Sequence, residues 1–279
     1  MEQWLFLVTI VTTAGAIGAI LGLGGGIVLV PILSMFYGVN LRDAMGASII
    51  SVIATSSGAA AAYLRSGLSN IRIGLFLAMA TVSGAIVGAG LVGIVPEALL
   101  ELTLGLALAY STLVTLRQLN LEIPSDRGND PLAMSFELEG AYYDAGLDRE
   151  VKYRAARVRS GLVAMFGAGV LSGLLGIGSG AFKVLAMDYF MRLPMKVSTA
   201  TSNFMIGITA AASAGIYFHR GDLRPLIVTP IALGVLIGAY LGTRLMTRLR
   251  NATLRKLFLP VILYLAVSMV LRGFGVHWP

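Results

Sequence analysis

The sequence predicts an all-α integral membrane protein that is built from two copies of one unit. Hydrophobic residues make up 57% of the 279 residues and charged residues 13%, whereas a soluble domain carries about 25% charged residues. Apolar runs of around 20 residues, the length needed to cross a bilayer, recur along nearly the whole chain. A glycine-rich motif in the first half also returns 154 positions later, which indicates an internal duplication.

The repeated motif is GLGGG at residues 22–26, and it is matched by GIGSG at residues 176–180. The same offset pairs Gly84 with Gly238, far along the chain. Chance similarity between glycine-rich apolar helices is the alternative, but a constant offset argues against it. Internal duplication is typical of membrane transporters, whose two copies act as moving halves.

The duplication divides the chain into membrane repeat 1 (residues 1–118), a cytoplasmic insert (119–159) and membrane repeat 2 (160–279). Each repeat is expected to consist of apolar segments. In the first repeat they cover residues 3–22, 23–37, 42–64, 71–95 and 98–117. In the second repeat they cover residues 160–176, 177–191, 196–218, 224–248 and 254–272.

The insert is the one sizeable polar stretch of the chain. Residues 135–139 and 150–154 alternate polar with apolar side chains, as half-buried strands do, and Ala145-Gly146 between them can turn the chain. A small β-hairpin on the cytoplasmic face is therefore expected, although a plain tether between the repeats would explain the insert as well. Because two strands alone are marginally stable, the hairpin should pack on the membrane domain or on the second subunit of a homodimer.

The glycine motifs leave the number of membrane segments open between eight and ten. Residues 3–37 are too long for a single span at about 1.5 Å per residue, and the motif at residues 22–26 interrupts them. If each such stretch crosses once, the two repeats are parallel; if it enters and returns, they are inverted. The inverted arrangement collects more Lys and Arg on one side, so we predict inverted repeats with a cytoplasmic insert and both termini outside.

The two glycine motifs are the strongest candidates for a binding site. A broken helix inside a membrane leaves backbone groups unpaired, which is tolerable only where they face protein or a watery cavity. The N–H groups at the start of the next helix suit an anion. The residues expected to contact a solute are Gly24, Gly25, Gly26, Gly178, Ser179 and Gly180. Tight helix packing is the alternative for such glycines, and it fits Gly84 and Gly238 best.

Lys183 is a further candidate because it lies inside an apolar run, and its counterpart in the first repeat is Leu29. An ionisable residue inside a membrane is costly and marks a functional site by default, here as the group that neutralises an anion. It could instead extend to an interface or pair with Asp188.

Hydroxyl and amide groups cluster in the segment that follows each glycine motif. Such groups can replace the hydration shell of an oxyanion, although they also hold transmembrane helices together. The members of this cluster that we expect at the site are Ser48, Thr201, Ser202 and Asn203.

Several classes of function are disfavoured. The chain has a net charge of +7, but its Lys and Arg residues lie mostly at segment ends and in the insert. This distribution fits topology signals and contacts with anionic lipids and does not indicate nucleic-acid binding. With no cysteine and two histidines, we expect no metal site and no cofactor. The chain contains no HExxH, GxSxG or GxxxxGK[ST] motif, so neither an enzyme nor an ATP-driven pump is expected. A cleavable signal peptide is not expected either, because Glu2 stands where a basic region should be.

The motifs resemble a known family. GLGGGIVLVP at residues 22–31 followed by Ala47-Ser48, and LSGLLGIGSG at residues 171–180 followed by ATSN at 200–203, are similar to the two signatures of the TauE/SafE sulfite exporter family. The resemblance covers nearly the whole chain apart from the insert. It implies a multi-pass protein of the cell (inner or plasma) membrane that transports small sulfur-containing anions, with protons as the coupling ion often proposed.

The chain departs from the family pattern in the second motif. Ser179 replaces the middle glycine, Leu185 stands where a proline is expected, and Lys183 lies within the motif. The predicted function is a secondary transporter, an exporter, of sulfite or an organosulfonate by alternating access around a central site between the repeats. The alternatives are an anion channel, which would need a continuous polar lining, and a transporter of another small carboxylate or oxyanion.

Overall fold

The structure is a computed structural model of the chain. It describes residues 2–22, 24–26, 29–30, 33, 39, 41–91, 95–96, 98–99, 102, 105–106, 109–110, 112–113, 116, 130–144, 147–176, 178–221, 223, 225–246 and 251–276.

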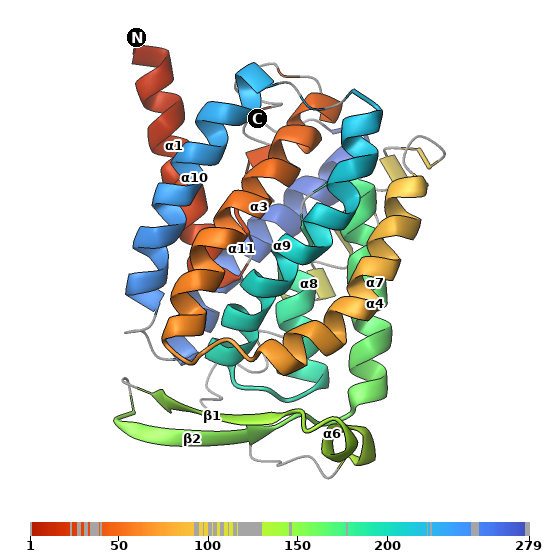
Figure 1. Cartoon of the computed structure of the whole chain (residues 1–279). Coiled ribbons are helices and arrows are strands. Elements are labelled where there is room, and N and C mark those ends of the chain that lie inside the picture. The colour runs from red at the N-terminus through yellow and green to blue at the C-terminus, as the bar shows by residue number, and fades with distance from the viewer. Residues whose placement is uncertain are drawn as a thin grey trace.

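The described residues form a helical bundle with one small antiparallel hairpin, which confirms the predicted fold class (Figure 1). Among them, the apolar parts of four helices are long enough to cross a bilayer. The helices are α1 (Glu2–Leu21), α3 (Leu41–Arg65), α4 (Ile71–Gly90), α6 (Pro131–Ser135), α7 (Val158–Leu175), α8 (Gly180–Leu185), the π-helical turn η1 (Ala186–Phe190), α9 (Met195–His219), α10 (Pro225–Met246) and α11 (Asn251–Gly273). The strands are β1 (Glu139–Asp144) and β2 (Arg149–Arg154).

The two repeats pack on each other through equivalent glycines. A Cβ atom on Gly84 of α4 would lie 2.3 Å from the carbonyl oxygen of Phe166 in α7. A Cβ atom on Gly238 of α10 would lie 1.9 Å from the carbonyl oxygen of Thr12 in α1. Thr12 and Phe166 are themselves 154 residues apart. The helix-packing role of these glycines is thus confirmed, and each repeat uses the same contact on the other.

Equivalent helices of the two repeats run in opposite directions relative to the hairpin. Asn70, between the end of α3 and the start of α4, donates from Nδ2 to the carbonyl oxygen of Glu139 in β1. Lys196, in the first turn of α9, also contacts the hairpin. The hairpin therefore marks the end of α3 but the beginning of α9, its counterpart (Figure 1). The inverted insertion of the repeats in a membrane stays a prediction.

The first strand begins later than predicted. Residues 135–139 were expected to form it, but the strand starts at Glu139 and residues 131–135 form the short helix α6. Pro131 is suited to the first helical position because its missing N–H has no partner there in any case. Asp130 caps the helix, accepting from the backbone N–H of Leu132 at 2.8 Å. The predicted turn at Ala145-Gly146 lies outside the described residues.

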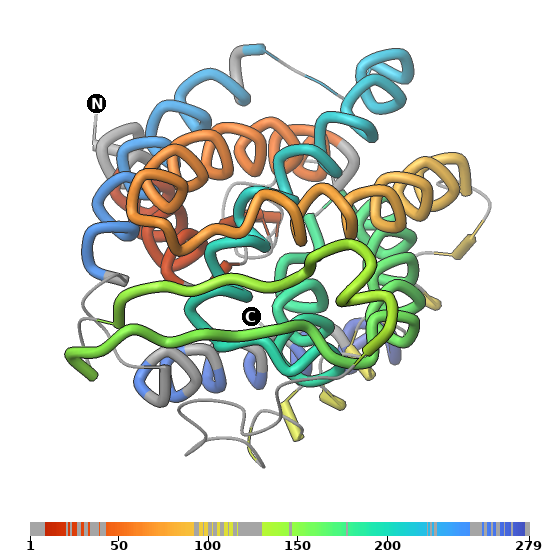
Figure 2. The backbone as a smooth tube through the Cα atoms, turned by 60° about the horizontal axis from the view of Figure 1, so that its bottom comes forward, coloured from red at the N-terminus to blue at the C-terminus, as the bar shows by residue number. Residues whose placement is uncertain are grey.

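The hairpin is amphipathic and lies across one end of the bundle (Figure 2). Tyr142, Val151 and Tyr153 are buried, whereas Tyr143 and Lys152 on the opposite face are exposed. The hairpin therefore packs on the helices of its own chain, which is the first of the two surfaces expected for it. Association into a homodimer stays a prediction.

A buried ion pair joins the hairpin to α9. Lys196 Nζ lies 2.7 Å from Asp144 Oδ1, and both side chains are 1% exposed. Tyr142 donates its hydroxyl to the other carboxylate oxygen at 3.1 Å. Asn70 at the start of α4 donates to the hydroxyl of Tyr153 at 3.1 Å. The starts of α4 and α9 are therefore held by the hairpin.

Removing one partner of this ion pair should destabilise the protein strongly, because the remaining charge stays buried without its counterion. We expect Asp144→Ala to lower the free energy of unfolding by about 3–5 kcal/mol, measured as thermal unfolding in detergent. The double variant Asp144→Leu with Lys196→Met should recover most of that loss. Equal stability of Asp144→Ala and the parent would show that the pair does not hold the hairpin in place.

Candidate functional site

Both glycine motifs break the helices that contain them. The helix α1 ends at Leu21 and α7 ends at Leu175, and left-handed backbone follows in each repeat. Glycine adopts this conformation without steric cost. The left-handed residues are Gly22, Gly24 and Gly25 in the first repeat, and Gly176, Gly178 and Ser179 in the second. The predicted interruptions are therefore present at equivalent positions, with Gly26 itself helical and Gly180 opening α8.

In the second repeat the broken stretch enters the bundle and returns. Val158, at the start of α7, donates its backbone N–H to Asp130 Oδ2 at the hairpin end. Ala156, just before α7, donates its N–H to the carbonyl oxygen of Met191, just after η1, at 2.9 Å. The chain thus comes back to the end from which it started. The residues that would show the same in the first repeat, 34–38, lie outside those described.

The two breaks come together at the centre of the bundle, where both contact Val52 of α3 and Ile206 of α9. A Cβ atom on Gly24 would lie 3.1 Å from Ile206, and one on Gly178 would lie 2.9 Å from Val52. Val52 and Ile206 are related by the same 154-residue offset. The two breaks therefore face each other across the pseudo-symmetric contact between α3 and α9.

Ser202 and Asn203 on α9 bind the broken backbone. The hydroxyl of Ser202 donates to the carbonyl oxygen of Gly22 at 3.0 Å, and the carbonyl oxygen of Gly180 lies 3.4 Å away. Asn203 donates from Nδ2 to the carbonyl oxygen of Ala19 in α1 at 2.9 Å. One side chain of α9 thus contacts both breaks.

Thr201, the third residue of this predicted cluster, lies elsewhere. Its hydroxyl oxygen accepts the backbone N–H of Asn70 at 3.1 Å, so it contacts the start of α4. Thr201 was predicted to join Ser202 because the two are adjacent in the sequence. Successive residues of an α-helix point in directions about 100° apart, and at this position the side chain reaches the start of α4.

Lys183 lies fully buried beside the second break. Its ammonium donates to the hydroxyl of Thr209 at 2.9 Å and to the carbonyl oxygen of Gly178 at 3.2 Å. The hydroxyl of Thr81 on α4 lies 3.2 Å from that of Thr209. The ammonium therefore has neutral partners, and the alternative pairing with Asp188 is not formed.

Thr81 was not among the predicted site residues, although the sequence contains a signal for it. Its counterpart in the second repeat is Val235, just as the counterpart of Lys183 is Leu29. Positions that are polar in one repeat and apolar in the other therefore converge on the same point. Thr209 joins them, and it is polar in both repeats because its counterpart is Thr55.

Several buried polar atoms of α3, α9 and the second break have no hydrogen-bond partner within the described part of the chain. Buried polar groups are normally paired, so each such atom requires an explanation. Hydroxyl and amide groups that are buried and unpaired can bind a polar solute. The atoms are the hydroxyl oxygens of Ser48, Ser179, Ser198 and Thr199, and Oδ1 of Asn203.

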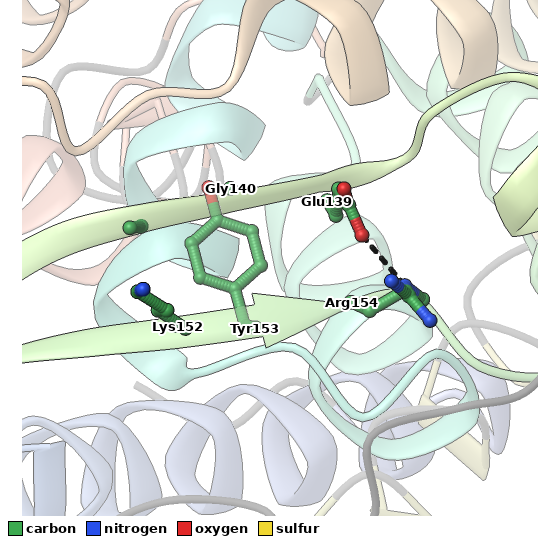
Figure 3. Close-up of a pocket in the computed structure, with 6 residues that line it drawn as sticks. Glu139, Gly140, Lys152, Tyr153 and Arg154 are labelled. Atoms are coloured by element: carbon green, nitrogen blue, oxygen red, sulfur yellow. Dashed lines mark hydrogen bonds and ion pairs between the residues drawn. The ribbon is translucent and has the colours of Figure 1, made fainter.

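A separate surface pocket of about 410 Å³ lies on the hairpin (Figure 3). Arg154 at its edge is paired with Glu139 at 2.6 Å, and Lys152 also lines it. Because this pocket is open to solvent at the end of the bundle, we do not assign a transported solute to it. Among the described residues, no group of three or more acidic or histidine side chains is placed to hold a metal ion.

Ser179 combines a left-handed backbone, with φ of 46°, and a buried hydroxyl that has no hydrogen-bond partner among the residues the structure describes. Both features cost free energy, so Ser179→Gly should raise the stability of the solute-free protein by about 1 kcal/mol. If the hydroxyl binds the solute, the same variant should bind it more weakly. Thermal unfolding with and without solute measures both effects. A variant that is less stable than the parent would contradict the first expectation, and unchanged solute binding would contradict the second.

The chain is similar in sequence to known membrane proteins. The family model described as "Sulfite exporter TauE/SafE" matches residues 6–269. Two Bacillus subtilis proteins are similar: "Probable membrane transporter protein YunE" is 24% identical, covering 97% of this chain and 98% of its own, and "Probable membrane transporter protein YdhB" is 24% identical, covering 86% and 89%. A "Probable membrane transporter protein" of Xylella fastidiosa is 24% identical over 96% of this chain and 97% of its own. No solved structure matches the chain.

Proposed function

We propose that the chain, which belongs to the TauE/SafE family of membrane transporters, is a secondary transporter that exports a small sulfur-containing anion such as sulfite or an organosulfonate. The observation that carries the proposal is the meeting of two helix breaks at Ser202, next to the buried ammonium of Lys183. The family membership makes the chain a multi-pass membrane protein. The identity of the solute, the direction of transport and the transport mechanism are what we propose.

The charge of Lys183 supports an anionic solute. A buried ammonium is costly unless a negative charge compensates it. The hydrogen-bond partners of this ammonium, Thr209 and Gly178, are neutral. A bound anion would supply the missing charge. The buried hydroxyls of Ser179 and Thr199, which have no partner among the described residues, could donate hydrogen bonds to its oxygen atoms.

The pairing of the repeats supports alternating access. Each repeat contributes one break, and both breaks contact Val52 and Ile206, which are equivalent residues. Rocking one repeat against the other about this contact would open the centre to either side in turn. The opposite directions of α3 and α9 relative to the hairpin fit repeats that are inverted in the membrane.

The proposal predicts that Lys183→Ala weakens binding of the cognate anion. Purified protein in detergent would be unfolded thermally with sulfite, thiosulfate, sulfate, taurine and sulfoacetate, since a ligand of the native state raises the melting temperature. We expect the dissociation constant of the stabilising anion to rise at least about tenfold in the variant, because a charge-assisted contact is lost. Lys152→Ala removes an exposed lysine of the hairpin and should bind as the parent does.

Equal shifts in Lys183→Ala and the parent would remove Lys183 from the site. Counterflow in proteoliposomes then separates the mechanisms. Saturable uptake of labelled anion that is driven by unlabelled anion inside supports a transporter, whereas flux without counterflow supports the channel alternative. Acceleration of the same flux by an imposed pH gradient would support proton coupling.

A further inference from the structure

We infer that the solute carried at this site bears a single negative charge, because one repeat supplies an ammonium and the other does not. The inference rests on the proposed function and adds the charge class of the solute. It depends on three features of the chain: the position of its cations, the neutrality of the other groups at the breaks, and the equivalence of Leu29 and Lys183.

Lys183 is the one lysine or arginine within an apolar segment, since the others lie near segment ends, between segments or in the insert. The other fully buried lysine, Lys196, is paired with Asp144 at the hairpin. Among the described residues, the lysine ammonium that the interior of the bundle can offer to a solute is therefore that of Lys183.

The remaining polar groups at the breaks add hydrogen bonds but no charge. Ser179, Thr199 and Ser48 present buried hydroxyls without partners in the described part of the chain. A solute with one negative charge and several oxygen atoms would neutralise the ammonium and use these donors. A divalent anion would leave one negative charge uncompensated in an apolar surrounding, which is strongly unfavourable.

The first repeat has the backbone for a second such group but lacks the charge. The N–H of Leu29 donates to the carbonyl oxygen of Gly25 at 3.1 Å, and the N–H of Lys183 donates to that of Ser179 at 3.2 Å. These two bonds are equivalent under the 154-residue offset, and Leu29 is fully buried as Lys183 is. Leu29→Lys would therefore place a second ammonium at the related position, near Thr55, the counterpart of Thr209.

The test compares methanesulfonate with sulfate, which are similar tetrahedral anions that carry one and two charges. Thermal unfolding of the purified protein at matched ionic strength gives a dissociation constant for each. Salts, and sulfate strongly, also stabilise proteins in general. The stabilisation that each anion causes in Lys183→Met measures this general effect and is subtracted from that of the parent. We expect methanesulfonate to bind the parent at least about tenfold more tightly than sulfate. Sulfate binding as tightly as methanesulfonate, or more tightly, would overturn the inference.

Leu29→Lys should change the ratio of the two dissociation constants by about tenfold or more in favour of sulfate. Leu29→Met, of similar size and without charge, should keep the ratio of the parent. An unchanged ratio in a folded Leu29→Lys protein would also overturn the inference. If Leu29→Lys does not fold, the comparison in the parent decides alone.

The two proposals fail in distinguishable ways. A Lys183-dependent preference for sulfate would overturn the single-charge inference and leave the anion transporter standing. If neither probe nor any sulfur anion of the wider screen gives a Lys183-dependent shift, both proposals fall.

Discussion

A helix that is broken inside an apolar bundle must have its free backbone groups satisfied by other parts of the protein, and the rest of this structure depends on how that is done. The carbonyl oxygen of Gly22 is bound by Ser202, that of Gly178 by Lys183, and that of Ala19 by Asn203. Each bond brings a polar side chain into the centre of a membrane protein. The groups that stabilise the breaks are therefore the same groups that can meet a polar solute.

The two repeats share a frame of packed helices but differ in their buried polar residues. Glycines at equivalent positions let α4 approach α7 and α10 approach α1 in the same way, so the frame is close to symmetric. Lys183 and Thr81 have the apolar counterparts Leu29 and Val235, and they converge on Thr209. A symmetric frame suits two halves that move against each other, whereas under the proposed function the polar asymmetry would set which solute the centre binds.

The sequence predicted the features that depend on local residues. The ends of most described helices lie within a few residues of the predicted segments, because long apolar runs and glycines with left-handed backbone act locally. The first strand was placed too early, because the cap formed by Asp130 and Pro131 outweighed the alternation of polar and apolar residues.

Contacts between residues that are far apart along the chain could not be predicted from the sequence. The bond between Thr81 and Thr209 depends on how α4 packs against α9, and the pair of Lys196 with Asp144 depends on where the hairpin docks. Neither is a matter of spacing along the chain. The hydrogen bond between Thr201 and Asn70 is of the same kind, because Asn70 lies at the start of α4, far away along the chain.

The central claim is that the two repeats are inverted about a shared centre, and the topology of equivalent loops tests it most directly. Ser66 directly follows α3, and Arg220, 154 residues later, directly follows the equivalent helix α9. Both residues are exposed, and the chain has no cysteine of its own. Single Ser66→Cys and Arg220→Cys variants would be exposed to a membrane-impermeant maleimide on intact cells. The account predicts that Arg220→Cys is labelled from outside and Ser66→Cys only after permeabilisation. Labelling of both from the same side would contradict it.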